Sequence, residues 1–125
     1  MARSFQAVCK SCQHIFPAEE GGCISFELLR CRKCGRAKEV LYEDIWDTYL
    51  ALLKGMQPEL PELNGADWRT FSGEPITNRE YRRRVVAKAG VCSCGGRFSF
   101  NAPLRCPSCG SDSVADDGSC SLLID

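Results

Sequence analysis

The sequence has very little histidine and no long apolar run. Only His14 is present among 125 residues, and the longest uncharged apolar stretch, Thr48 to Leu53, is far too short to cross a bilayer. The first residues, Met1 to Gln6, contain no apolar segment that could form the core of a signal peptide. We therefore expect a cytoplasmic protein that has no membrane partner.

Catalytic motifs are also missing. The sequence has no glycine-rich phosphate loop, no serine nucleophile motif and no metalloprotease helix. A cysteine–histidine catalytic pair would have to use His14, which stands two residues beyond Cys12. Cys23 and Cys120 could be redox thiols, but no sequence neighbour of either thiol argues for a lowered pKa. These absences favour a protein that is not an enzyme.

Cysteine, by contrast, is abundant. The chain has ten cysteines, and eight of them form four close pairs: Cys9/Cys12, Cys31/Cys34, Cys92/Cys94 and Cys106/Cys109. Disulfide frameworks of small secreted proteins seldom use such pairs, whereas tetrahedral metal sites do so routinely. The spacing therefore favours metal ligands over disulfides. We expect the two unpaired cysteines, Cys23 and Cys120, to be small buried apolar residues.

Glycine follows three of the four pairs directly, at Gly35, Gly95 and Gly110. A tight turn that points two thiolates at one ion needs a positive φ at this position. Gln13 takes the same place after Cys12 and departs from the pattern. With these motifs the sequence resembles the zinc-ribbon, or rubredoxin-like, group of metal-binding folds over about residues 5–41 and 90–118. The resemblance is specific for a metal site and says little about function.

The motifs and this resemblance together predict two zinc ions, each bound by one ribbon independently of the other. One ion would be held by Cys9, Cys12, Cys31 and Cys34, and the other by Cys92, Cys94, Cys106 and Cys109. Four thiolates complete a tetrahedron and leave no vacancy for His14 and no open position for catalysis. Four thiolates also hold one iron in rubredoxins, so iron stays an alternative.

Hydrophobic patterning predicts a small α+β protein stabilised by metal, in which two β-hairpin zinc ribbons flank two central helices. The predicted divisions are an N-terminal zinc ribbon at residues 1–41, a helical and linker segment at 42–89, and a C-terminal zinc ribbon at 90–125. Alternating apolar residues predict strands within both ribbons, at residues 23–30 and 96–100.

Two helices are expected between the ribbons. Residues 43–54 place apolar side chains at helical spacing, and Gly55 should end that helix. Thr77 and Glu80 form a capping box for a second helix, which should run to Ala89 before Gly90. Prolines and glycines mark residues 56–76 as a linker, but its aromatic residues suggest that it packs onto the rest of the protein.

The second helix, residues 78–89, is strongly basic. Its exposed side would carry Arg79, Arg82 and Arg83 as a candidate binding surface. We expect a protein partner, because a net charge of zero gives weak long-range attraction to a polyanion. Nucleic acid binding through this helix stays open. A second interpretation also stays open, in which the arginines are only solvated or form ion pairs with the acidic segment at 41–78.

Three classes of function remain after these arguments. The first, which we favour, is a zinc-stabilised adaptor that binds a protein or a nucleic acid. The second is a rubredoxin-like iron protein that carries electrons. The third is a zinc-handling chaperone or sensor, which would need one labile site.

Overall fold

Two three-stranded antiparallel sheets form the β part of the fold. The structure is a computed structural model that describes residues 2–20, 26–63 and 65–124. The first sheet has the order β2-β1-β8 and the second has the order β4-β3-β7. Their strands are β1 (Ala2–Cys9), β2 (Ile15–Glu20), β3 (Phe26–Cys31), β4 (Ala37–Leu41), β7 (Phe98–Ser99) and β8 (Val114–Ile124). The predicted small α+β class is confirmed.

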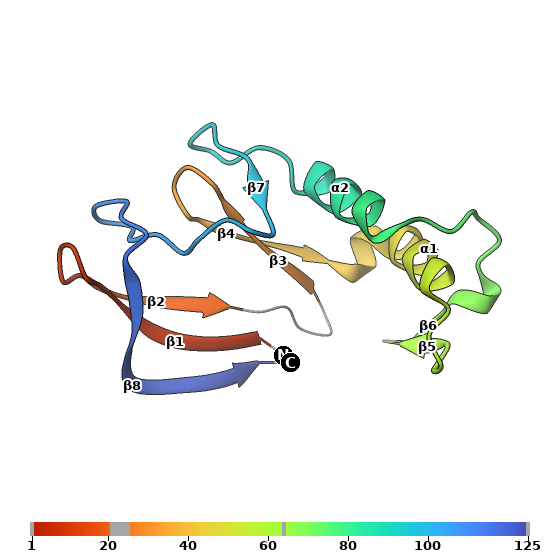
Figure 1. Ribbon diagram of the computed structural model, residues 1–125, viewed down its shortest axis with the longest axis horizontal. Coiled ribbons are helices and arrows are strands. Elements are labelled where there is room, and N and C mark those ends of the chain that lie inside the picture. The colour runs from red at the N-terminus through yellow and green to blue at the C-terminus, as the bar shows by residue number, and fades with distance from the viewer. Residues whose placement is uncertain (1, 21–25, 64, 125) are drawn as a thin grey trace.

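The chain is nested, because its two ends share one sheet. Ala2 pairs with Ile124 and Cys9 pairs with Val114, so β1 and β8 run side by side (Figure 1). We call residues 2–20 and 104–124 the outer unit and residues 26–103 the inner unit. Each sheet thus combines strands from the N-terminal and C-terminal halves of the chain. Strand β8, which joins the ends, was not predicted.

Two helices lie together at one end of the molecule and do not separate the sheets (Figure 1). They are α1 (Trp46–Met56), preceded by a 3-10 turn at Tyr42–Ile45, and α2 (Asn78–Ala89). The predicted cap of α2 is present, because the Thr77 hydroxyl accepts a hydrogen bond from the Glu80 amide at 3.1 Å. The Glu80 side chain was expected to reach back to Thr77. It instead binds two arginines on its own helix, as described below.

The first helix does not end at Gly55 as predicted. It continues to Met56 and ends at Gln57, which has a left-handed φ of 45°. Gly55 serves packing instead, because a Cβ there would stand 2.6 Å from the carbonyl oxygen of Ile76. The Ile76 amide donates to the Ala51 carbonyl at 3.2 Å, so the chain approaching α2 lies directly against α1.

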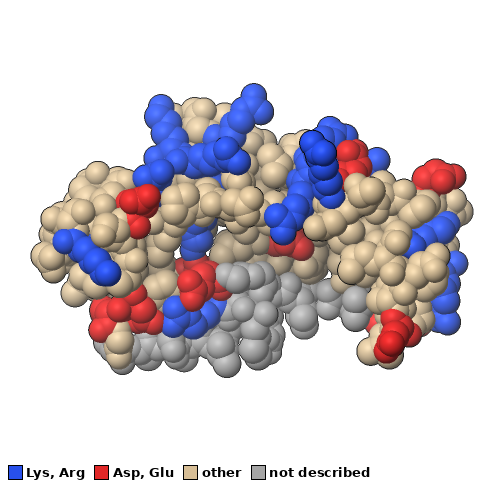
Figure 2. Space-filling view, in the orientation of Figure 1, with Lys and Arg blue, Asp and Glu red and all other residues tan. Residues whose placement is uncertain are grey.

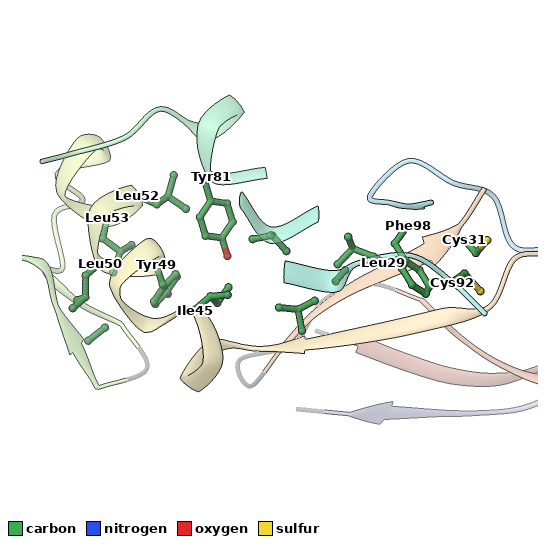
Figure 3. Close-up of a cluster of buried hydrophobic side chains, with 14 residues drawn as sticks. Leu29, Cys31, Ile45, Tyr49, Leu50, Leu52, Leu53, Tyr81, Cys92 and Phe98 are labelled. Carbon is green, nitrogen blue, oxygen red and sulfur yellow. The ribbon is translucent and has the colours of Figure 1, made fainter. Parts of the chain in front are cut away.

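Among the side chains that the structure describes, the hydrophobic core belongs mainly to the inner unit. Fourteen buried residues form one continuous cluster that runs from α1 to the cysteine turns (Figure 3). Trp68 and Phe71 of the predicted linker pack against this cluster, as expected. The linker also contains a short pair of strands, β5 (Glu62–Leu63) and β6 (Ala66–Asp67), and a 3-10 turn at Trp68–Thr70. None of the helices in the described residues is long and apolar enough to span a membrane.

Candidate metal centres

Four cysteine turns with a common backbone geometry form the candidate site. In each turn the carbonyl of the first cysteine accepts a hydrogen bond from the backbone amide of a residue that has a left-handed φ. These donors are Gln13, Gly35, Gly95 and Gly110, at 2.8–2.9 Å, with φ values of 66°, 78°, 89° and 77°. Gln13 therefore adopts the conformation of the glycines that it replaces.

The four turns meet in two groups of cysteines. The first group is Cys9, Cys12, Cys106 and Cys109, and the second is Cys31, Cys34, Cys92 and Cys94. Within each group all sulfurs lie within 4.8 Å of one another. We call these groups the outer and inner quartets.

Sulfur separations in both quartets suit a metal ion. In the outer quartet, Cys9 and Cys109 are 3.5 Å apart and Cys12 and Cys106 are 3.6 Å apart. The inner quartet has the same two spacings. Four sulfurs at 2.3 Å from a tetrahedral ion would stand ~3.8 Å apart, whereas a disulfide would bring two sulfurs to ~2.0 Å. Both quartets can therefore hold a metal ion.

The predicted grouping of the cysteines is wrong. All eight predicted cysteines lie in the quartets, but each quartet takes one pair from the N-terminal half of the chain and one from the C-terminal half. The reason is sheet pairing over long range. Pairing of β1 with β8 brings the turn at 106–109 against the turn at 9–12. Pairing of β3 with β7 brings the turn at 92–94 against the turn at 31–34.

A signal for this arrangement was present in the sequence. The segment after the last cysteine pair contains Val114 and ends in Leu122, Leu123 and Ile124, which is a pattern typical of a strand. A strand of that kind needs a partner, and β1 supplies it. Hydrogen bonds at the turns follow this pairing, because the Lys10 amide donates to the Ser113 carbonyl at 2.8 Å.

Backbone amides surround the sulfurs. The amides of Lys33, Gly96 and Ser108 each point at a cysteine sulfur, at a donor–sulfur distance of 3.4 Å. Gly96 has no room for a side chain, since a Cβ there would stand 2.5 Å from the Cys31 sulfur. These amides favour thiolates, which are the form of cysteine that binds metal.

The environment favours the thiolate form of Cys9 in the outer quartet and of Cys31 and Cys92 in the inner quartet, because it lowers their pKa values. Burial disfavours ionisation of Cys9, but the amides of Cys12 and Ser11 outweigh it and lower the pKa of Cys9 to about 6. Cys31 has a pKa of about 6 for the same reasons. At Cys12, the His14 amide favours the thiolate, yet burial and the neighbouring sulfurs raise the pKa to about 12. Four thiolates so close together require a cation to neutralise them.

The two quartets differ in exposure. The first cysteine of every pair is buried, but Cys12 and Cys109 of the outer quartet are exposed, while Cys34 and Cys94 of the inner quartet are half-buried. His14 belongs to neither quartet and stacks on Phe16 at a ring separation of 5.9 Å.

The predicted roles of the two unpaired cysteines fall outside what the structure describes. Cys23 lies outside the described residues. Cys120 lies in β8, and its side chain is outside the described part. The expectation that both are buried apolar residues therefore stays a prediction.

A basic surface borders the inner quartet. Arg79, Arg82 and Arg83 line one shallow groove of about 290 Å³ together with Phe100. The guanidinium of Arg82 lies 5.1 Å above the centre of the Phe100 ring. Figure 2 shows Lys and Arg side chains gathered over α2 and over the adjacent cysteine turns. The exposed basic residues of these turns are Arg32, Lys33, Arg36 and Arg97. Sequence reasoning had placed Arg97 beside the basic helix but missed the other three.

Part of this positive charge is already neutralised. Glu80 accepts from Arg83 at 2.8 Å and from Arg84 at 3.0 Å, and these bonds lower the pKa of Glu80 to about 2. Within the described residues, no ion pair joins α2 to the acidic segment at 41–78. Arg79 and Arg82 thus keep charge that is free of ion pairs in that part of the structure.

Comparison with known proteins gives a family and no function. Residues 5–115 match a family described as a domain of unknown function (DUF8255). No curated protein and no solved structure matches the chain.

Proposed function

The chain belongs to the DUF8255 family, and we propose that it is a zinc-binding adaptor with two structural four-cysteine sites. The observation that carries this proposal is the pair of complete sulfur quartets. Zinc suits such a donor set, and four protein thiolates leave no open coordination position for catalysis. The outer ion would tie the two ends of the chain to each other, and the inner ion would tie together the two cysteine turns that carry part of the basic surface.

Metal content and quartet membership can be tested together. We expect two zinc ions per chain when protein purified without added metal is analysed by elemental analysis and native mass spectrometry. The matched variants Cys109→Ser and Cys94→Ser should each lose one ion. The double variant Cys12→Ser/Cys109→Ser distinguishes the two groupings of the cysteines. In the structure both residues belong to the outer quartet, so this variant should still retain one ion. The grouping predicted from sequence would instead lose both.

The same measurement decides between zinc and its alternatives. Red protein containing iron would favour a rubredoxin-like electron carrier, since the donor set alone does not distinguish the two metals. Two zinc ions, one of which is lost to a weak chelator at neutral pH, would favour zinc handling. Two retained zinc ions support the structural role.

We further propose that the adaptor binds an acidic surface of a protein partner through Arg79, Arg82 and Arg83. The support is the uneven charge of the molecule, whose basic residues collect at α2 and the inner turns although the net charge is zero. Nucleic acid is the second candidate. Phe100, which lies under Arg82, is the observation that favours it, because aromatic rings beside arginines stack on bases.

Two probes distinguish these partners. Poly-glutamate and a single-stranded oligonucleotide should be titrated against the zinc-loaded chain at several salt concentrations. We expect Arg79→Gln/Arg82→Gln to weaken poly-glutamate binding by about tenfold, since each contact adds a modest charge term. The charge-matched control Lys10→Gln/Lys38→Gln removes two cations that do not line the groove. Equal weakening in both variants would refute this surface, and tighter oligonucleotide binding would favour nucleic acid.

A further inference from the structure

A buried arginine, one nitrogen of which has no hydrogen-bond partner among the described residues, lies between the two sheets. Arg30 is on the central strand β3, opposite Ala37 of β4 and Ser99 of β7, and only 8% of its surface is exposed. Its Nε is buried and makes no hydrogen bond within the described residues. None of the ion pairs in the same residues includes Arg30. A buried charged donor without an acceptor is costly, so a ligand that supplies the acceptor would be stabilised there.

The side chain of Arg30 borders a cavity of about 580 Å³ between the outer and inner units. We call it the interunit cavity. Apolar side chains from the outer unit, Phe16, Ala18 and Leu104, form one part of its wall. The volume is within the range of sites that take small organic molecules, and such sites are mostly apolar with a few fixed polar groups.

The polar part of the wall is strongly basic. Arg36 and Arg105 join Arg30 there, and Glu19 is the one acidic residue among the described lining residues. Arg36 donates to the Ser93 hydroxyl at 3.2 Å. Arg105 donates to backbone carbonyls at 3.3 Å. Both therefore donate to neutral acceptors, and the cavity wall has three arginines against one carboxylate among its described residues.

Nearby carboxylates are engaged elsewhere. Arg30 also borders a second cavity of about 400 Å³, and Glu20 and Glu27 are among the residues that line it. Glu20 is paired with Arg3 at 2.6 Å, and Glu27 accepts from the Tyr42 and Tyr81 hydroxyls at 2.9 and 3.0 Å. Neither carboxylate is within ion-pair distance of Arg30.

We propose that the interunit cavity binds an organic carboxylate, in which one carboxylate group is attached to an apolar body. The unpaired atom of Arg30 is Nε, and the edge of a guanidinium that carries Nε is suited to the two oxygens of a carboxylate. Arg36 and Arg105 reinforce the charge, and Phe16 and Leu104 receive the apolar body.

The cavity is a different place from the basic groove on α2, and it depends on both metal centres. Cys34 and Gly35 of an inner turn and Pro107 of an outer turn lie in its wall. The inference therefore rests on the metal-binding part of the proposed function, and the zinc content must be measured in every sample. A chain without two zinc ions overturns the proposed function, whereas a chain that has them and binds no carboxylate overturns only this inference.

Phenylacetate is a suitable probe, with neutral phenylacetamide as its matched control. We expect phenylacetate to shift the Nε–Hε resonance of Arg30 saturably in nitrogen-15 NMR spectra of the zinc-loaded chain, and phenylacetamide to leave it unchanged. Arg30→Lys keeps the charge but removes the Nε donor, and should weaken binding at least about tenfold. Arg97→Gln removes an exposed arginine that does not line the cavity and should bind as the wild type does.

A second variant covers the case in which Arg30→Lys does not fold. Arg36→Gln changes an exposed residue in the cavity wall and should weaken phenylacetate binding by about threefold or more. No saturable shift up to the solubility limit of phenylacetate, or equal affinities for Arg36→Gln and Arg97→Gln, would overturn the proposal. Tighter binding of phenyl phosphate would overturn the assignment to carboxylates.

The source of the carboxylate can be identified by competition. The acetylated and amidated peptide Leu-Glu-Leu carries one acidic side chain between two apolar ones. Displacement of phenylacetate by this peptide supports an acidic side chain of a partner protein. Phenylacetate binding that the peptide does not displace supports a free organic acid.

Discussion

The outer and inner units bind similar sulfur quartets but differ in what else holds them together. Among the side chains that the structure describes, the outer unit buries a cluster of six residues, two of which are the metal-centre cysteines Cys9 and Cys106. The inner unit buries fourteen residues from two helices and a sheet. The described part of the outer core is too small to offset the loss of chain entropy, so we expect metal to supply most of the stability of this unit. The outer unit should therefore depend on its ion more than the inner unit does.

Loss of each ion in turn should give the largest effect. Cys106→Ser removes a buried ligand of the outer quartet, and Cys92→Ser removes its counterpart in the inner quartet. Structural zinc contributes on the order of 10 kcal/mol to folding of small domains, which exceeds what the outer core can replace. We expect Cys106→Ser to abolish hydrogen-exchange protection in β1 and β8 while α1 and α2 stay protected.

The Cys92→Ser variant supplies the control for that comparison. It should lose its ion and the protection of the turn at 92–94, but retain slow exchange in α1, where Leu50 and Leu53 are buried far from Cys31 and Cys92 of the inner quartet (Figure 3). Equal loss of protection throughout the chain in both variants would contradict this comparison. It would show that the two units fold as one and that they do not differ in how much their stability depends on metal.

Acid should release the outer ion first. Protons compete with metal for thiolates, so affinity falls as the pH falls. Two outer thiols, Cys12 and Cys109, have raised pKa values, because burial and neighbouring sulfurs outweigh their backbone amides. In the inner quartet Cys34 has a raised pKa, while Cys31 and Cys92 have lowered ones. Native mass spectrometry along an acid titration should therefore show a one-ion species that retains the inner ion.

The mass of the one-ion species does not show which quartet holds the ion, so a variant is needed to assign it. In Cys109→Ser, whose single ion is the inner one, release should occur at the lower of the two wild-type midpoints. Release at the higher midpoint would reverse the predicted order of the two quartets.

How the units contact each other can be tested at Gly35. Its φ is 78°, and an added Cβ would stand 2.6 Å from the Cβ of Arg105 and 2.9 Å from its amide nitrogen. Gly35→Ala should cost about 2–5 kcal/mol of unfolding free energy, as left-handed strain and steric overlap combine. Gly110 has a φ of 77° with nothing within 4 Å, so Gly110→Ala should cost only the strain, about 1–2 kcal/mol.

Denaturant unfolding of the zinc-loaded variants measures both costs. The clash at Gly35 lies where an inner turn touches the outer unit, so the larger loss would report on the contact between units. If the two alanine variants were equally destabilised, Arg105 could move aside freely and the units would not be tightly coupled.

Local features of this fold were predictable from sequence, whereas long-range ones were not. The cap at Thr77 and the stop at Gly90 depend on neighbouring residues, and both are present. The identities of the paired cysteines follow from turns of a few residues. Their grouping depends on which strands pair, and that is set by β8, whose partner is more than a hundred residues away. Sequence proximity alone favoured the wrong quartets.

The interunit cavity shows the same limit. Arg30 ends a predicted strand and has the period-two position of Phe26 and Leu28, but a charged side chain at the end of a strand is ordinarily expected to be exposed. Its burial arises because the outer unit, which includes Phe16 and Leu104, lies against the inner sheet at this point. Such packing between units is determined by the nested topology and so could not be read before the strand pairing was known.

The smallest expected effect concerns the one turn that lacks glycine. Gln13 holds a φ of 66° in the outer unit, and its amide side chain makes one long bond, at 3.3 Å to the Lys10 carbonyl. Gln13→Gly should relieve left-handed strain but add entropy to the unfolded chain, for a net gain of about 0.5–1 kcal/mol. Gln57→Gly makes the same change at the end of α1 in the inner unit, where φ is 45°.

The two variants make the same substitution at a left-handed position, one in each unit, so any difference between them reports on the unit in which the residue lies. Hydrogen exchange of the zinc-loaded variants should show slower opening of β1 and β2 in Gln13→Gly and of α1 in Gln57→Gly. If the units are energetically distinct, neither variant should protect the other unit. Protection that spread from Gln13→Gly into α1 would mean that the outer unit limits the stability of the whole chain, which would make the metal at its quartet the determinant of the entire fold.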